Sequence, residues 1–141
     1  ACMALLDLAL HHEDGAPLQI HTIAERQKIP KEFLLQILNE LKRAGLVDSK
    51  RGAAGGYYLA KQPKSISVGD VLRIIDGSIL EMECFKKEEK GFGKGCEREE
   101  GCNFRSVWDE VRKIVVGAVN GITFEDLSRK VRGKELAKDN I

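Results

Sequence analysis

Three of the four cysteines lie in one stretch of the chain that has almost no periodic apolar residues. Cys84, Cys96 and Cys102 follow the spacing C-x11-C-x5-C among lysines, glutamates and glycines, so we expect a long loop there. Three thiolates on such a loop suit an iron–sulfur cluster whose fourth ligand comes from elsewhere in the protein. The spacing lacks the close cysteine pairs of zinc fingers and of thioredoxin-like sites. It therefore favours an iron–sulfur cluster, with zinc or another metal as an alternative.

Basic side chains gather in a second stretch, between positions 42 and 64. Six of them stand against one acidic residue, Asp48, so the local charge is +5, although the formal net charge of the chain is only +1. They are Lys42, Arg43, Lys50, Arg51, Lys61 and Lys64. A focal basic patch is typical of contact with DNA, although a solvated charged face can have the same composition.

A helix and a β-hairpin are the elements expected to carry this patch. Apolar residues recur after Pro30 at three- and four-residue spacing, at Phe33, Leu34, Ile37, Leu38 and Leu41. Pro30 is expected at the first helical position, and Gly45 in the left-handed conformation that ends the helix. Residues 46–47 and 57–59 are predicted to be strands on either side of a glycine-rich tip. A helix followed by a basic hairpin is the winged helix-turn-helix arrangement, which binds double-stranded DNA.

The residues expected to touch DNA divide into three groups. Lys31, Glu32 and Gln36, on the exposed N-terminal part of this helix, are expected to reach base edges, and Gln36 is chemically able to pair with adenine. Arg51 at the hairpin tip is expected to enter the minor groove, where Gly52 allows close backbone approach. Four further residues are expected to contact phosphates: Lys42, Arg43, Lys50 and Lys61.

The whole chain is predicted to be mainly α with a small β-wing, an α+β fold. Residues 1–77 are expected to form the winged helix-turn-helix DNA-binding domain. It should have earlier helices near residues 1–12 and 21–28, a short strand at 18–20 and a later helix at 66–76. Ser67 and Asp70 stand at the positions of a capping box for this later helix. Residues 78–102 are the cysteine-containing, cluster-binding loop, and residues 103–141 are the dimerisation helix with a short helix and tail.

The most regular apolar spacing lies between residues 103 and 119. Its stripe comprises Phe104, Val107, Trp108, Val111, Ile114, Val115 and Ala118. We interpret it as a dimerisation helix, because a domain of this size has little else to cover it; an ordinary core helix is the alternative. A final short helix is expected at 123–131 with Thr123 as its cap, followed by a frayed polar tail from Arg132.

Composition limits the class of protein. The chain has 141 residues, of which 43% are hydrophobic and 32% charged, as in ordinary soluble domains. No apolar run approaches the roughly 18 residues of a membrane span and no signal peptide is visible, so a cytoplasmic protein is expected. No nucleophile–base pair stands at readable spacing, so an enzyme is not expected. A small redox enzyme or electron carrier would leave the basic hairpin without a role.

Several motifs, in order along the chain, resemble those of the Rrf-two family of bacterial regulators, the group of IscR, NsrR, RirA and CymR types. They are LLDLA at 5–9, IAERQ at 23–27, LKRAGLV at 41–47, RGAAGGYYL at 51–59, ISVGDV at 66–71, and Cys96-x5-Cys102 with Trp108 beyond it. The resemblance covers nearly the whole chain. It implies a homodimer that binds a pseudo-palindromic operator. It also implies a [2Fe–2S] or [4Fe–4S] cluster on the three loop cysteines, with iron supply, oxygen or nitric oxide as its signal.

The chain departs from the family pattern at three positions. Cys84 lies eleven residues before Cys96, where a shorter gap is usual; Arg105 replaces the ligand histidine of the IscR type. Leu35 replaces the recognition-helix acid that tunes operator choice in that type. The fourth ligand stays open among Glu81, Glu83, Glu97 and Glu99. The alternative is a cluster-free repressor controlled by a protein partner or by thiol oxidation, as in the CymR type.

Overall fold

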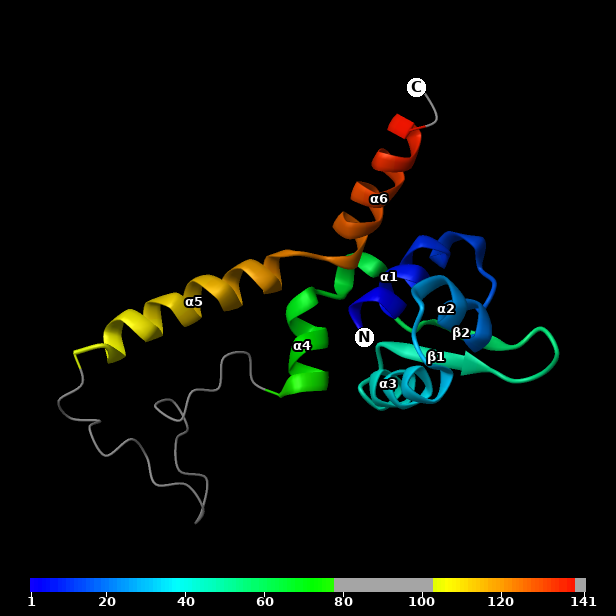
Figure 1. Cartoon of the computed structure of the whole chain (residues 1–141), viewed down its shortest axis with the longest axis horizontal. Coiled ribbons are helices and arrows are strands. Elements are labelled where there is room, and N and C mark those ends of the chain that lie inside the picture. The colour runs from blue at the N-terminus through cyan, green and yellow to red at the C-terminus, as the bar shows by residue number, and fades with distance from the viewer. Residues whose placement is uncertain (78–102, 139–141) are drawn as a thin grey trace, which may run out of the picture.

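The computed structural model describes residues 1–77 and 103–138 and is mainly helical, with one two-stranded antiparallel sheet. The elements in order are α1 (Cys2–Leu10), η1 (His12–Asp14), α2 (Ile20–Gln27), α3 (Lys31–Arg43), β1 (Val47–Lys50), β2 (Gly56–Leu59), η2 (Pro63–Ser65), α4 (Val68–Asp76), α5 (Arg105–Gly121) and α6 (Phe124–Lys138). Helices α1 to α4 and the hairpin form one body, from which α5 and the hairpin tip extend to opposite sides (Figure 1). The predicted α+β class with a small β-wing is confirmed.

The core of this body is built on one face of α3. Leu34, Ile37, Leu38 and Leu41 are buried there, as their spacing predicted, and α3 packs on α2, α4 and β1. Phe33 was predicted on the same face, but it is 57% exposed, so that prediction is wrong. Each residue turns an α-helix by about 100°, which places Phe33 beyond the edge of the buried stripe.

The turns that bound α3 hold it in its orientation. Lys28 ends α2 in the left-handed conformation, with φ 53°. Pro30 precedes α3 as its N-cap residue and not as its first helical residue, because its ψ of 132° is extended. Gly45 has φ 71°, which confirms the predicted left-handed exit, and the N–H of Leu46 donates to the carbonyl of Leu41 at 3.0 Å.

A buried carboxylate links the first two helices. Asp7 of α1 is 3% exposed, and Nη1 of Arg26 in α2 donates to its Oδ1 at 3.3 Å. His11, the C-cap residue of α1, lies with Nδ1 at 3.4 Å from the same oxygen. The arginine compensates a charge that would otherwise be costly to bury, so this pair fixes how α2 packs on α1.

The hairpin pairs β1 with β2 from Val47 opposite Leu59 to Lys50 opposite Gly56. Leu18 adds an antiparallel bridge to Tyr57, with reciprocal N–H to carbonyl bonds of 2.9 and 2.8 Å. The strand predicted at 18–20 is therefore a single bridge. A Cβ on the neighbouring Gly56 would collide with the Leu18 carbonyl, so only glycine allows this close approach.

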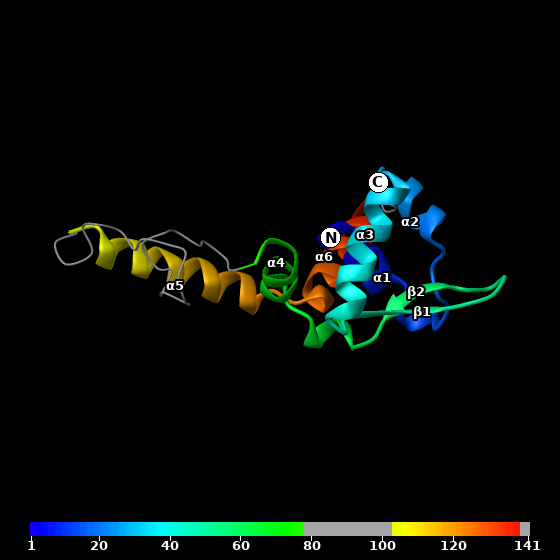
Figure 2. The same ribbon diagram turned by 90° about the horizontal axis from the view of Figure 1, so that it is seen from below.

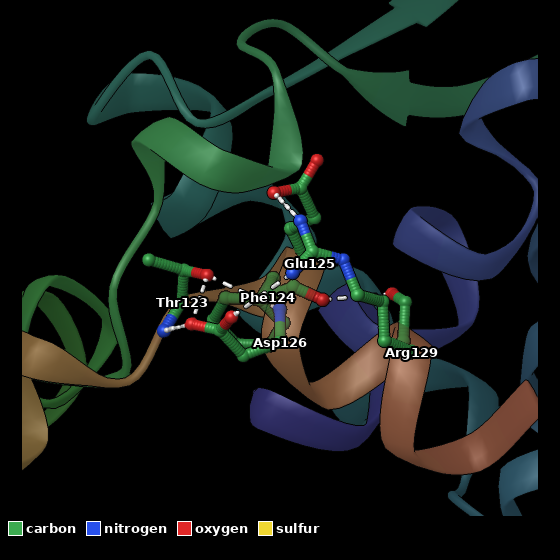
Figure 3. A network of polar contacts seen from close by, with 6 residues as sticks. Thr123, Phe124, Glu125, Asp126 and Arg129 are labelled. Atoms are coloured by element: carbon green, nitrogen blue, oxygen red, sulfur yellow. Dashed lines mark hydrogen bonds and ion pairs between the residues drawn. The ribbon is translucent and has the colours of Figure 1, made fainter. Parts of the chain in front are cut away.

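Helices α4 and α6 each begin with a capping box, and their starts lie side by side. Ser67 caps α4: its Oγ accepts from the N–H of Asp70, and Asp70 Oδ2 accepts from the N–H of Ser67, as predicted. Thr123 and Asp126 make the equivalent bonds at the start of α6 (Figure 3). The two cap regions pair directly, because the Val68 N–H donates to the Ile122 carbonyl at 2.9 Å.

Helix α6 is longer than the sequence suggested. The tail predicted to fray from Arg132 instead continues the helix to Lys138. Arg132 explains the difference, because its guanidinium donates to Glu13 at 2.9 Å and to the carbonyl of Leu10 at 2.8 Å, which ties α6 to the end of α1. Over residues 1–77 and 103–138, none of the helices has the length and apolar character needed to cross a membrane.

Candidate nucleic-acid interface

The face of α3 opposite the core is polar and open. Glu32, Gln36, Asn39 and Arg43 follow one another at four-, three- and four-residue intervals, and all four are exposed. That spacing places them in one row along the helix. Lys31 is exposed at the start of the same helix. The row therefore presents carboxylate, amide and guanidinium groups of the kinds that pair with base edges in the major groove.

Asn39 belongs to this row although the residue pattern did not single it out. It is exposed one turn beyond Gln36. The available signal was the three- and four-residue spacing that also joins Glu32 to Gln36. Leu35, beside the row, is 42% exposed, so α3 also carries apolar surface on its open side.

The tip of the hairpin between β1 and β2 extends beyond the helical body (Figure 2). Lys50 and Arg51 are exposed at the end of β1, and Gly52 turns the chain with φ 113°. The Gly55 N–H donates to the carbonyl of Gly52 at 2.9 Å, which closes the tip. Gln19, just before α2, donates to the Ala53 carbonyl at 3.2 Å and so holds the tip from the side. Spacing in the sequence did not point to Gln19.

Lys42 is exposed but, unlike the other basic residues expected to bind DNA, its ammonium group has partners within the described protein. Its Nζ lies 2.9 Å from Oδ1 of Asp48 and donates to Oγ of Ser49 at 2.6 Å. The Lys42 hydrogen bond, followed by that from the Ser49 N–H, holds the pKa of Asp48 below its usual value. The other five basic residues expected to bind DNA are exposed and make no ion pair or hydrogen bond through their charged groups within residues 1–77 and 103–138: Lys31, Arg43, Lys50, Arg51 and Lys61.

In the part of the chain that the structure describes, the apolar stripe of α5 is largely exposed. Phe104 and Ile114 are each 65% exposed, Trp108 is 41% exposed, and no residue of α5 is buried within the described chain. The helix meets the body at its C-terminal end, where Arg73 of α4 donates to Oδ1 of Asn120 at 2.8 Å. A Cβ on Gly69 would meet the end of the Asn120 side chain, so a larger residue at this joint would have to displace that side chain.

The three cysteines expected to bind a cluster, Cys84, Cys96 and Cys102, lie outside the described residues. Cys2, in α1, is a partly buried free thiol. The described ranges hold no group of three or more His, Cys, Asp or Glu side chains placed to bind a metal ion. The chain enters residues 78–102 from α4 and leaves them just before α5.

Helices α2 and α3 followed by a basic, glycine-tipped hairpin define the chain as a winged helix-turn-helix protein. The model of the Rrf2 family, described as iron-dependent transcriptional regulators, matches residues 1–130. The chain belongs to this family, so it is a DNA-binding transcription regulator, and the resemblance inferred from its motifs is confirmed.

Curated relatives and solved structures agree with this assignment. The chain is 36% identical over 127 residues to the HTH-type transcriptional regulator IscR of Serratia proteamaculans (strain 568), covering 90% of this chain and 73% of the relative. It is 34% identical to T. potens IscR with a TM-score of 0.70, over 92% of this chain and 80% of that one. It is also similar to CymR, the global cysteine regulator of B. subtilis, at 29% identity and TM-score 0.70, over 92% and 91% of the two chains.

Proposed function

We propose that the chain acts as a homodimer on a pseudo-palindromic operator, with α3 in the major groove and the hairpin over the adjacent minor groove. The observation that carries this proposal is the open row of Glu32, Gln36, Asn39 and Arg43 beside the unpaired, basic hairpin tip. A recognition helix reads base edges, and a positive hairpin reaches the backbone and the minor groove.

The contacts divide by chemistry. Lys31, Glu32 and Gln36 contact base edges, and Arg51 enters the minor groove, where Gly52 turns the chain. Lys50 and Lys61 contact phosphates, as does Arg43 from the end of α3. Phosphate contacts supply affinity and salt dependence, whereas the base contacts supply sequence preference.

The second part of the proposal is that α5 pairs with α5 of another copy. Its apolar stripe is exposed along most of its length, from Phe104 to Ile114. A symmetric dimer places two recognition helices about one turn of DNA apart, which a pseudo-palindromic operator requires. In this division, residues 1–77 bind DNA, residues 78–102 carry the sensing cysteines and residues 103–141 hold the dimer together.

The third part is that Cys84, Cys96 and Cys102 hold an iron–sulfur cluster. The donor set fits, because thiolates are the ligands of such clusters and a fourth ligand can come from another residue. The family description as iron-dependent regulators and the IscR relatives support it. Bound there, a cluster would make the segment between α4 and α5 sensitive to iron supply, oxygen or nitric oxide.

Selection of bound duplexes from a random DNA library, followed by anisotropy titration of the selected duplex, tests the DNA-binding part. We expect an inverted-repeat sequence. We expect Arg51→Ala to weaken binding to every duplex, and Gln36→Ala to weaken the selected duplex more than a scrambled one. Glu125→Gln, in α6, is the control. Recovery of no common sequence, or equal losses for the two duplexes with Gln36→Ala, would refute the proposed reading of bases.

Visible absorption of protein purified without oxygen, with iron and sulfide counted per chain, tests the cluster. We expect charge-transfer bands that disappear in a Cys96→Ala, Cys102→Ala double variant. A colourless protein after reconstitution with iron and sulfide would refute the cluster. It would favour the second candidate, a cluster-free repressor controlled by a protein partner or by thiol oxidation, which the similarity to B. subtilis CymR supports.

A further inference from the structure

We propose that Asp48 limits sequence-independent DNA binding by engaging Lys42 in an ion pair on the protein surface. Lys42 then joins α3 to the hairpin instead of neutralising a phosphate. This inference rests on the proposed DNA-binding function, and it reassigns one of the residues expected to contact the backbone.

The geometry is a small network between the end of α3 and the two strands. Lys42 lies in the last turn of α3, and its Nζ reaches Asp48 Oδ1 at 2.9 Å and Ser49 Oγ at 2.6 Å, both in β1. Asp48 Oδ1 also accepts from the N–H of Ser49 at 2.7 Å. On the opposite strand, the hydroxyl of Tyr58 lies 3.5 Å from Asp48 Oδ2, and Tyr58 pairs with Asp48 in the sheet register. One carboxylate thus organises side chains from α3, β1 and β2.

The N–H donors and the positive charge that would let Lys42 bind a phosphate are already engaged in this network. A lysine ammonium has three N–H donors. In Lys42, two of them are directed to Asp48 and Ser49. Asp48 supplies the opposite charge and keeps it at neutral pH, because the Lys42 contact favours its ionised form. A phosphate approaching Lys42 must compete with this carboxylate and also meets its negative charge.

The consequence is a restraint on non-specific binding. Each phosphate neutralised by a free cation adds affinity that does not depend on sequence. Arg43, Lys50 and Arg51 remain available near the recognition helix, because they pair with nothing in residues 1–77 and 103–138. Because Lys42 is paired with Asp48 and does not contact a phosphate, the sequence-independent part of the affinity is lower, while the base contacts of α3 are unchanged. The same bridge holds the spacing between α3 and the hairpin.

A double-mutant cycle in salt titrations tests this role. The four proteins are the wild type, Asp48→Asn, Lys42→Gln and the double variant, each titrated onto a selected and a scrambled duplex. Freeing Lys42 by Asp48→Asn should add one phosphate contact per protomer. The slope of log affinity against log salt on the scrambled duplex should therefore steepen by about 1.8 for a dimer. That is an affinity change of about twelve-fold over a fourfold range of salt. The selected-to-scrambled affinity ratio should fall. Lys42→Gln alone should leave the slope unchanged, and the double variant should match it.

Three results would overturn the inference. The first is a slope that drops by about 0.9 per protomer with Lys42→Gln alone, which would make Lys42 a free phosphate contact. The second is a salt slope that Asp48→Asn steepens equally in the presence and in the absence of Lys42. The third is an equal steepening of that slope by Glu125→Gln, which removes one negative charge from α6. Thermal unfolding of each variant verifies folding. Failure of the proposed function is distinct, because the wild type would then bind no duplex, or Arg51→Ala would leave binding unchanged.

Discussion

Replacing Ile114 by alanine tests whether the stripe on α5 is the dimer interface. Ile114 is 65% exposed in the single chain and lies within this stripe. Alanine is the better helix former, so the substitution should not weaken α5 itself. Any change in self-association then reports the loss of apolar surface from the contact between the two copies.

The size of the effect follows from the exposed surface. Truncation of isoleucine to alanine removes three carbon groups, each worth about 0.8 kcal/mol when fully buried. Because 65% of Ile114 is free to become buried, the loss is about 1.5 kcal/mol per protomer. Ile114 occurs twice in a symmetric dimer, so the total is about 3 kcal/mol, or a dissociation constant roughly 150-fold larger.

Sedimentation equilibrium over a range of protein concentrations measures this constant. The matched control is Leu35→Ala, which also truncates an exposed aliphatic side chain but lies on α3, where Leu35 is 42% exposed. We expect this control to leave dimerisation unchanged. An unchanged dissociation constant for Ile114→Ala, or an equal change for Leu35→Ala, would refute the assignment of α5 as the interface.

Three further predictions concern the folded unit and are read from urea unfolding. Gly56→Ala places a Cβ against the Leu18 carbonyl and should cost about 1–3 kcal/mol, whereas Gly133→Ala, which has open space on α6, should be neutral or stabilising; equal effects would contradict this. Thr123→Ala removes the hydroxyl that caps α6 and should cost about 1 kcal/mol, with Thr123→Ser keeping most of the stability; equal losses would show that the cap is not responsible. Burial raises the pKa of Asp70, but hydrogen bonds from Ser67 and Arg73 outweigh it and leave the pKa below its usual value. Its contribution is therefore complete above the unfolded-chain pKa of about 3.9 and is lost as the pH falls through the folded-state pKa. Asp70→Asn should accordingly be less stable than the wild type at pH 6 and approach it near pH 3, and a constant difference would be the contrary result.

The local elements were predictable because their signals lie between near neighbours. Leu34, Ile37 and Leu41 are buried because their spacing puts them on one side of a helix, whatever that helix packs against. The cap of α4 was predictable for the same reason, since Ser67 and Asp70 are three residues apart. The burial predicted for Phe33 was wrong because residue spacing gives the direction of a buried helix face but not its width.

Contacts between residues far apart in the chain were not predictable in this way. Arg132 stabilises the C-terminal part of α6 by binding Glu13, which is 119 positions away in the sequence. The residues next to Arg132 in the sequence predict only a polar tail. Gln19 holds the hairpin tip from 34 positions away. The sequence showed Asp48 as the one acidic residue among six basic ones. Its ion pair with Lys42 could not be predicted, because that pairing depends on the angle between α3 and β1. Pairings of this kind follow from the packing of elements, which the pattern of one element does not contain.

The two apolar stripes of the chain show where sequence reasoning stops. Those on α3 and α5 have the same three- and four-residue spacing. The first is buried by α2, α4 and β1, whereas nothing in residues 1–77 and 103–138 buries the second. Periodicity predicts that a face will be covered but not whether the cover belongs to the same chain. The two stripes differ because α3 packs within the body, whereas α5 contacts the body at one end, where Asn120 binds Arg73. Because Phe104, Trp108 and Ile114 lie beyond that joint, we expect a second copy of α5 to cover them, an arrangement that would leave both recognition helices free for DNA.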